Sequence, residues 1–238
     1  RTDVVECAPP AGGDGPGAAA AWTAFDSQGR PLPTEPGDSG RIRVRVGPVP
    51  AVGTAVFFLR PSKPTPATVV PGWTLENRYL RVTIDSATGG IARMYDKVHR
   101  RDVLARGPTT NGLVLMVDRP KDYDAWNIDN LDGARTWLVA RTAETPPRIG
   151  RDAFGTSITV YRGKDSSLVT QRYELPADGD RLDVETKVDW HQSHELLKAV
   201  FPLAFHVDST HAEIPYAVIG RTTRPRTRQD SARFETPM

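Results

Sequence analysis

The chain has 238 residues, of which 38% are hydrophobic and 25% are charged, as in proteins that fold around a packed core. Its 31 basic and 29 acidic residues leave a formal net charge of only +2, and no basic stripe alternates with aromatic residues, so we expect no binding to nucleic acid. No apolar run approaches the roughly 20 residues that a membrane-spanning helix needs, so we expect no membrane association. Cys7 is the only cysteine, which excludes an internal disulfide and leads us to expect a cytoplasmic protein.

Residues 1–60 predict a small β-sandwich. Residues 1–7 alternate in polarity, and residues 41–47, "RIRVRVG", place their apolar side chains on one face and their arginines on the other. Residues 54–60 supply another strand after a turn-rich connection. Residues 8–21 are rich in alanine, glycine and proline, and we expect a flexible loop or an irregular insertion there.

A larger antiparallel β domain is predicted over residues 73–238, after a proline-rich linker over residues 61–72. Residues 79–85 and 91–97 predict a hairpin across "SATGG", whose glycines allow a positive φ. Three more strands are expected to follow as an antiparallel meander, over residues 156–163, 167–175 and 181–190. Because no convincing amphipathic helix is visible, the predicted fold class is all-β.

One motif is typical of a metal or acid–base site. Residues 188–203, "VDWHQSHELLKAVFPL", gather two histidines with acidic residues and a lysine. In a strand, His191 and His194 point to opposite faces, whereas a helical turn would bring them together with Glu195 following. A catalytic zinc needs three protein ligands, and a third is not obvious nearby. The spacing therefore favours a structural cluster over a metal site.

A second motif surrounds a tryptophan with acidic and amide side chains. Residues 121–132, "KDYDAWNIDNLD", place four aspartates and two asparagines around Trp126. Clefts that bind sugars use this mixture, because carboxylates and amides bond hydroxyl groups and an aromatic ring covers the apolar face of a sugar. Paired carboxylates can also act as general acid and nucleophile. The alternative is a solvated turn capped by Asp and Asn, with the tryptophan anchored in the core.

A third motif, residues 151–157 or "RDAFGTS", places Asp152 shortly before Phe154 and Gly155. A nucleophilic aspartate could occupy such a place. However, the segment runs directly into a predicted strand, and an aspartate at a turn that enters a strand usually has no chemical role.

Several segments together resemble the C-terminal region of glycoside hydrolase family 38 α-mannosidases. "VDWHQSHELLKAVFPL", followed by "AEIPYAVIGRTTRP" and "DSARFETP", is similar to that family's "DWxExHxLLKxxFP" and to the two runs that follow it. "YDAWNIDN" is similar to "WDAWDxD", and "TLENRYLRVTIDSATGGIARMYDK" is similar to "LENxxLxVxxDxxGxIxSLxDK". The opening "RTDVVEC" and "VGPVPAVGTAVFFL" resemble the small β-sandwich of the family. The resemblance spans essentially the whole chain, in order.

This resemblance implies a small Ig-like β-sandwich followed by a larger galactose-mutarotase-like antiparallel supersandwich. It also implies that the full-length parent is a retaining, metal-dependent α-mannosidase whose nucleophile and zinc ligands lie in an N-terminal barrel. That barrel is missing here, so we expect no catalytic residue, metal ligand or cofactor in this chain, with zinc in the missing catalytic domain. We also expect both ends to be cut, the large domain to be truncated at its C-terminus, and the isolated chain to be inactive.

The resemblance also implies roles for two of the motifs. "VDWHQSHELLK" matches a signature of the β-sandwich, so His191 and His194 are expected to pack and to hydrogen-bond. The nucleophile of the family lies in an Asp-x-Phe-Gly context, but Asp152 falls in the sandwich region, so that match is expected to be a coincidence.

The "YDAWNIDN" segment supplies the candidate site residues. Asp124, Trp126 and Asp129 match the family segment and are expected to line a substrate cleft or a domain interface. Tyr123 and Asn127 depart from the usual Trp and Asp, which weakens a role that depends on charge.

We therefore expect a non-catalytic β region that braces its missing N-terminal catalytic domain and helps to wall the cleft for an α-mannoside substrate. The surface that contacts that domain should expose a large apolar patch. A homo-oligomer is compatible with the sequence. Two alternatives stay open. A mutarotase-like or lyase-like enzyme needs His206 or His211 to converge with Glu213. A stand-alone carbohydrate-binding module needs exposed aromatic residues along a groove, such as Trp126, Trp137 or Tyr161.

Overall fold

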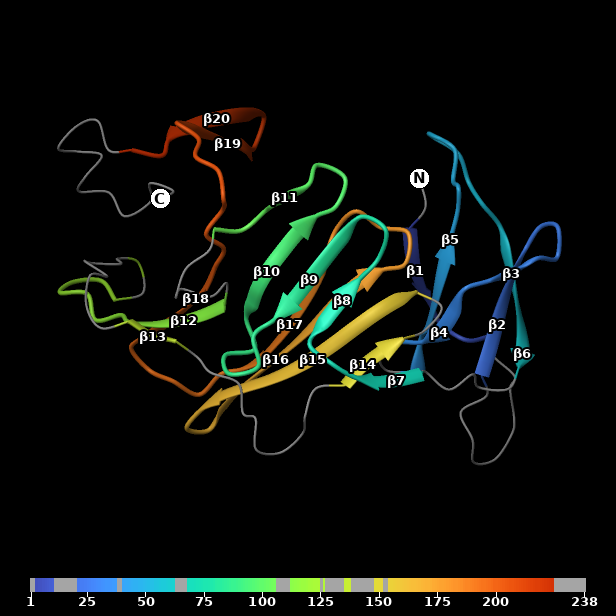
Figure 1. Cartoon of the computed structure of the whole chain (residues 1–238), viewed down its shortest axis with the longest axis horizontal. Coiled ribbons are helices and arrows are strands. Elements are labelled where there is room, and N and C mark those ends of the chain that lie inside the picture. The colour runs from blue at the N-terminus through green and yellow to red at the C-terminus, as the bar shows by residue number, and fades with distance from the viewer. Residues whose placement is uncertain are drawn as a thin grey trace. The chain divides into compact units, whose positions relative to one another are not determined.

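The computed structural model describes residues 3–10, 21–37, 40–62, 68–105, 112–124, 126, 135–137, 148–151 and 154–224. Every regular element named within these residues is a β-strand, and the strand pairs described below are antiparallel (Figure 1). The predicted all-β class is therefore confirmed. Among the described residues, no helix is long and apolar enough to cross a membrane.

The chain divides into two compact units. The first comprises Arg1–Arg78, Pro147–Thr159 and Arg172–Val184, and the second comprises Tyr79–Pro146, Val160–Gln171 and Glu185–Met238. Each unit therefore combines segments that are distant in the sequence. The domain boundaries predicted near residues 60 and 73 are not tested by this division and stay a prediction.

Two three-stranded sheets of the first unit form a small sandwich. One sheet has the order β1-β5-β4, with β1 (Asp3–Cys7), β5 (Ile42–Val46) and β4 (Thr34–Pro36). The other has the order β3-β2-β6, with β3 (Pro31–Leu32), β2 (Ala21–Asp26) and β6 (Phe57–Ser62). Both sheets contribute to one core, in which buried Ala24, Ile42, Val44 and Val46 contact Trp22, Leu32, Phe57 and Leu59. The predicted alternation of β5 is confirmed, because its apolar face supplies this core.

A five-stranded sheet has the order β17-β16-β15-β14-β7. Its strands are β17 (Asp183–Asp189), β16 (Ser167–Pro176), β15 (Gly155–Lys164), β14 (Arg148–Arg151) and β7 (Thr68–Pro71). The three strands predicted after residue 155 are confirmed, and a turn at Asp165, with φ of 51°, separates β15 from β16. β7 falls within the proline-rich segment that we expected to be a linker, so part of that segment is a strand.

A four-stranded sheet has the order β11-β10-β9-β8. Its strands are β8 (Thr74–Glu76), β9 (Leu80–Ile84), β10 (Ile91–Asp96) and β11 (Arg101–Asp102). The predicted hairpin is confirmed, since β9 pairs with β10 from Leu80 opposite Asp96 to Ile84 opposite Ile91. The Asp85 carboxylate accepts hydrogen bonds from the amides of Ala87 and Thr88, at 2.8 and 2.7 Å, and Gly89 supplies the positive φ of 68°.

A second capped turn follows β10. Asp96 Oδ1 accepts hydrogen bonds from the amides of Val98 and His99, at 2.9 and 3.0 Å, and Oδ2 lies 2.6 Å from His99 Nδ1. The backbone hydrogen bond from His99, together with the imidazole contact, lowers the pKa of Asp96 below its ordinary value. This carboxylate therefore fixes the connection to β11.

The remaining strands belong to the second unit. One sheet has the order β13-β12-β18, with β13 (Arg135–Trp137), β12 (Gly112–Val117) and β18 (Glu195–Val200). Its buried Leu113 and Leu115 contact Val169, and Trp190 and Leu197 pack against them. A separate two-stranded ribbon pairs β19 (Ser209–Ile214) with β20 (Ala217–Thr222), and nearly all of its side chains are exposed.

Candidate functional site

The turn at residues 121–126 holds two of the three candidate cleft residues, Asp124 and Trp126, whereas Asp129 lies outside the described residues. The amide of Trp126 donates a 2.8 Å hydrogen bond to the carbonyl oxygen of Tyr123, which closes the turn. Tyr123 has φ of 56°, in the left-handed region that few non-glycine residues adopt. Trp126 is 88% exposed and Tyr123 is 76% exposed, so the interpretation of Trp126 as a core anchor is wrong. We call Tyr123, Asp124 and Trp126 the aromatic turn.

The two histidines of the "VDWHQSHELLK" motif contact different partners. His191 Nε2 lies 2.9 Å from Asp189 Oδ1 on the exposed surface. His194 has φ of 57° just before β18, and its carbonyl oxygen accepts a 2.8 Å hydrogen bond from the Asp118 amide. Within the part of the chain that the structure describes, no group of three or more His, Cys, Asp or Glu side chains could hold a metal ion.

A buried serine gives this motif a structural explanation. The Ser167 hydroxyl oxygen accepts hydrogen bonds from the His191 amide at 2.8 Å and from Gln192 Nε2 at 3.0 Å. Gln192 Nε2 also donates to the Lys164 carbonyl oxygen at 3.2 Å, and the Lys164 ammonium pairs with Glu195. The polar residues of the motif therefore hold the connection between β17 and β18 against the β15–β16 turn.

The alternative acid–base residues lie in solvent. His206 Nε2 is 3.6 Å from Asp208 Oδ1, with both side chains exposed. His211 and Glu213 share one face of β19, two residues apart, and both are exposed. The described residues therefore provide no enclosed surface on which this histidine and this carboxylate converge.

Two further aromatic residues, Tyr161 and Trp137, were named for a binding groove. Tyr161 lies alone on β15 and is exposed, and the side chain of Trp137 is outside the described part of the molecule. Trp126 is the most exposed tryptophan among the residues whose side chains the structure describes, and exposed Tyr123 lies three residues before it on the same turn.

The Phe154–Gly155 step of the third motif has a packing role. Phe154 is fully buried, and the guanidinium groups of Arg43 and Arg45 lie over its ring at 5.2 and 5.4 Å from the centroid. Its carbonyl oxygen accepts hydrogen bonds from Arg45 Nη2 and, at 2.8 Å, from the Ala177 amide. Asp152 lies outside the described residues.

Gly155 allows the start of β15 to approach the end of β16 closely. With φ of 153°, it adopts a backbone conformation that side chains disfavour. A Cβ at this position would lie 2.1 Å from the carbonyl oxygen of Leu175 and 2.8 Å from the amide nitrogen of Ala177. The glycine is therefore required by packing, independently of any chemistry at Asp152.

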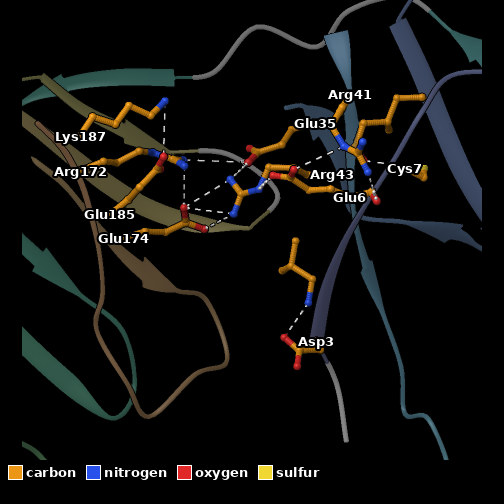
Figure 2. Close-up of polar contacts among 12 residues, drawn as sticks. Asp3, Glu6, Cys7, Glu35, Arg41, Arg43, Arg172, Glu174, Glu185 and Lys187 are labelled. Atoms are coloured by element: carbon orange, nitrogen blue, oxygen red, sulfur yellow. Dashed lines mark hydrogen bonds and ion pairs between the residues drawn. The ribbon is translucent and has the colours of Figure 1, made fainter. Parts of the chain in front are cut away.

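Figure 2 shows a cluster of paired charges in the first unit. Arg43 of β5 pairs with Glu35 of β4 and, through Nη2, with Glu174 Oε1 of β16 at 3.2 Å. Arg172 Nη1 lies 2.8 Å from Glu174 Oε2. Glu6 and Arg41 extend the cluster, with Arg41 donating to the Glu6 carbonyl oxygen at 3.0 Å. We call these residues the arginine–glutamate cluster: Glu6, Glu35, Arg41, Arg43, Arg172 and Glu174.

The centre of this cluster is largely shielded from water. The side chains of Arg43, Glu35 and Glu174 are 17%, 14% and 11% exposed. Burial alone would lower the pKa of the Arg43 guanidinium, but the hydrogen bond and charge of Glu174, with the charge of Glu35, hold that pKa above its ordinary value. The Arg43 guanidinium therefore stays protonated, and its ion pairs join β4, β5 and β16.

Exposed apolar side chains concentrate between residues 201 and 218 of the second unit. Seven large hydrophobic side chains are exposed there: Phe201, Leu203, Phe205, Val207, Ile214, Tyr216 and Val218. In the register of the β19–β20 ribbon, Ala212 lies opposite Ile219 and Ile214 opposite Ala217, so these four residues share one face, whereas Val218, opposite Glu213, lies on the other face. Scattered apolar side chains are normal on a surface, but a concentration of them marks an interaction surface. We call residues 201–218 the exposed apolar segment.

Comparison with known proteins gives a consistent result. Residues 75–238 match the model of the glycosyl hydrolases family 38 C-terminal domain. The chain is 27% identical over 163 residues to alpha-mannosidase 2C1 of Homo sapiens and 26% identical over 163 residues to alpha-mannosidase 2C1 of Mus musculus. It is also 28% identical over 167 residues to alpha-mannosidase G of Dictyostelium discoideum. Each match covers 68% of this chain but only 16%, 16% and 15% of the respective relative, so the chain spans a small part of their length.

Proposed function

Because this chain belongs to glycosyl hydrolase family 38, through the C-terminal domain of that family, we propose that it is the non-catalytic β region of a retaining, metal-dependent α-mannosidase. Its role is to brace a catalytic domain that lies outside the chain. The names of its relatives support the reaction class, and the small share of their length that it matches supports a partial role.

The observation that carries this proposal is the exposed apolar segment. Seven large hydrophobic side chains within eighteen residues, 201–218, remain in contact with water in this chain. Burial of these side chains against a docking partner would stabilise the complex by roughly 25 cal/mol per Å² of apolar surface removed from water. The proposed docking partner is the catalytic domain of the same protein, because the relatives are several times longer than the part that this chain matches.

The catalytic chemistry belongs to that partner. Retaining glycosidases need a carboxylate nucleophile and a carboxylic acid about 5 Å apart on either side of the bond that is cleaved. Two described acidic residues of the 188–203 motif are instead engaged in ion pairs, Asp189 with His191 and Glu195 with Lys164. We likewise propose that zinc is held by residues outside this chain, as membership of the family suggests. A cytoplasmic location and a homo-oligomer stay predictions.

Asp124, Trp126 and Asp129 would help to wall the α-mannoside cleft. Asp124 and Trp126 lie on one exposed turn, where a carboxylate and an aromatic ring are available to a sugar. Asp129 is included on its sequence match alone.

Hydrolysis of a chromogenic α-mannoside tests the proposal. We expect activity from the product of the whole reading frame and none from the 238-residue chain. In the longer protein, Val218→Asp should lower kcat/KM at least tenfold, because it places a charge in the proposed docking surface. Val56→Asp is the matched control, since Val56 is 62% exposed and Val218 is 67% exposed.

Two results would contradict the proposal. One is turnover of the mannoside by the 238-residue chain. The other is an equal effect of Val218→Asp and Val56→Asp on the longer protein.

A further inference from the structure

Neither the packing of the second unit nor the proposed docking surface explains why the aromatic side chains of the aromatic turn are exposed. Its two rings protrude into solvent, with Trp126 88% exposed and Tyr123 76% exposed. An aromatic side chain carries a large apolar surface that normally packs in a core or contacts a partner. Neither residue belongs to the hydrophobic clusters described above.

The hydrogen bond from the Trp126 amide to the Tyr123 carbonyl oxygen, at 2.8 Å, joins the two ends of a four-residue turn. The Cα atoms at the ends of such a turn lie within about 7 Å of each other. Both aromatic side chains therefore start from neighbouring points on the surface. Tyr123, the first residue of this turn, has a left-handed φ of 56°, which few residues with a side chain adopt.

The neighbours of the rings indicate the kind of partner. Lys121, Asp122 and Asp124 are all exposed beside them. The core of a protein–protein interface is depleted in lysine and aspartate. Saccharide sites combine aromatic rings, which cover the apolar face of a pyranose, with carboxylates that accept hydrogen bonds from its hydroxyl groups.

We propose that the aromatic turn is a saccharide-binding surface in its own right, in which Tyr123 and Trp126 stack on pyranose rings and Asp124 accepts hydrogen bonds from sugar hydroxyl groups. The inference deepens the proposed function, because Asp124 and Trp126 belong to the proposed cleft wall. It goes further in adding Tyr123, which departs from the family pattern, and in assigning a binding activity to this chain without its partner.

The test is a titration of the 238-residue chain with an α-linked mannotriose, in which binding is measured by isothermal titration calorimetry and by tryptophan fluorescence. Cellotriose serves as the control sugar. We expect measurable binding of the mannotriose, a loss of at least tenfold in affinity for Trp126→Ala and for Tyr123→Ala, and near-normal affinity for Trp126→Phe. Asp124→Asn should retain part of the affinity, because an amide oxygen still accepts a hydrogen bond.

Tyr216→Ala is the matched control variant. Tyr216 is also a fully exposed tyrosine in a turn with a left-handed φ, of 63°, but it lies between β19 and β20. Its removal should leave saccharide affinity unchanged. Circular dichroism of every variant checks that the fold is retained, which the exposure of the substituted side chains leads us to expect.

Three outcomes would overturn the inference. They are the absence of saccharide binding by the unaltered chain at millimolar concentration, an equal loss of affinity in Tyr216→Ala, and unchanged affinity in Trp126→Ala. If Trp126→Ala lowers the activity of the longer protein while saccharide affinity is unchanged, the turn contacts protein instead. These results are independent of the Val218→Asp comparison, so failure of this inference leaves the bracing role standing.

Discussion

The arginine–glutamate cluster and the exposed apolar segment represent two opposite solutions for a β-sheet surface. In the cluster, charged side chains from β4, β5 and β16 are shielded from water and paired with one another. In the exposed apolar segment, hydrophobic side chains that would be stable in a core remain in solvent. The charged side chains of the cluster find their partners within the chain, whereas the hydrophobic side chains of the exposed apolar segment contact water.

This difference separates stability from function. Substitutions in the first region should change the free energy of unfolding of the chain itself. Substitutions in the second region should leave that free energy nearly unchanged and affect only a process that involves a partner. The four predictions below test this separation, from the largest expected effect on stability to the smallest.

Gly155→Ala should be the most destabilising change. The new Cβ would lie 2.1 Å from the Leu175 carbonyl oxygen, so the backbone of β15 or β16 must move. We expect a loss of about 3 kcal/mol or more in the free energy of unfolding, measured by urea denaturation. Gly29→Ala is the control, because Gly29 has φ of 76° but open space around it, and it should cost only about 1 kcal/mol. Similar losses for the two variants would contradict the packing role of Gly155.

Arg43→Met should destabilise the chain by about 2 kcal/mol. The substitution removes the ion pair of Arg43 with Glu35 in a shielded position, although Arg172 still lies 4.0 Å from Glu35 Oε1 and 2.8 Å from Glu174 Oε2. The expected loss is therefore smaller than the roughly 3–5 kcal/mol for breaking a fully buried pair. Arg41→Met, at a side chain that is half exposed, should cost at most about 0.5 kcal/mol. Chemical denaturation of both variants decides this, and a larger loss in Arg41→Met would refute the ranking.

Acid should weaken the turn that Asp96 caps. Because the pKa of Asp96 is lowered in the folded chain, its charged form stabilises the fold above the ordinary pKa of about 4, and this contribution is lost as the pH falls through the folded value. The difference in unfolding free energy between the unaltered chain and Asp96→Asn should therefore shrink between pH 5 and roughly pH 2. Urea denaturation across this range measures it. A difference that stays constant with pH would exclude the stabilising role of the charge.

Phe205→Ser should have the smallest effect on the isolated chain. The side chain is exposed, so its removal should change the free energy of unfolding by less than about 0.5 kcal/mol. In contrast, Ala24→Ser, in the fully buried core of the first unit, should cost at least about 1 kcal/mol, because it buries a hydroxyl group. Thermal unfolding of both variants compares them, and a large loss for Phe205→Ser would mean that the exposed apolar segment already packs within this chain.

The sequence was sufficient to predict the fold class and the strands that alternate clearly in polarity. Period-two alternation placed Ile42, Val44 and Val46 on the inner face of β5, and "SATGG" placed the turn between β9 and β10. Alternation gives the face of a side chain but not its partner, however. Glu174 lies 131 residues from Arg43 in the sequence, so the arginine–glutamate cluster could not be predicted. Three arginines at alternate positions in residues 41–45 are the only local signal for it.

The candidate site was harder to predict, because the 121–132 segment lacks alternation. Composition alone allowed Trp126 to be a core anchor or a surface residue, and the structure exposes it. Tyr123 was noted as a departure from the family pattern, and its exposure and left-handed φ were not visible in the sequence. The spacing of the histidines favoured a structural cluster over a metal site, but the buried Ser167 that organises their connection carries no sequence signal.

The β19–β20 ribbon also has a consequence for motion. Two strands alone are marginally stable in water, and this ribbon is held mainly by its own six paired positions. Segments with many exposed backbone hydrogen bonds and few buried apolar contacts open locally at a small fraction of the free energy of global unfolding. The amides of β19 and β20 should therefore exchange with solvent much faster than those of β15 and β16. A docked partner would slow that exchange, so the exchange rate of these amides would show whether the partner is bound.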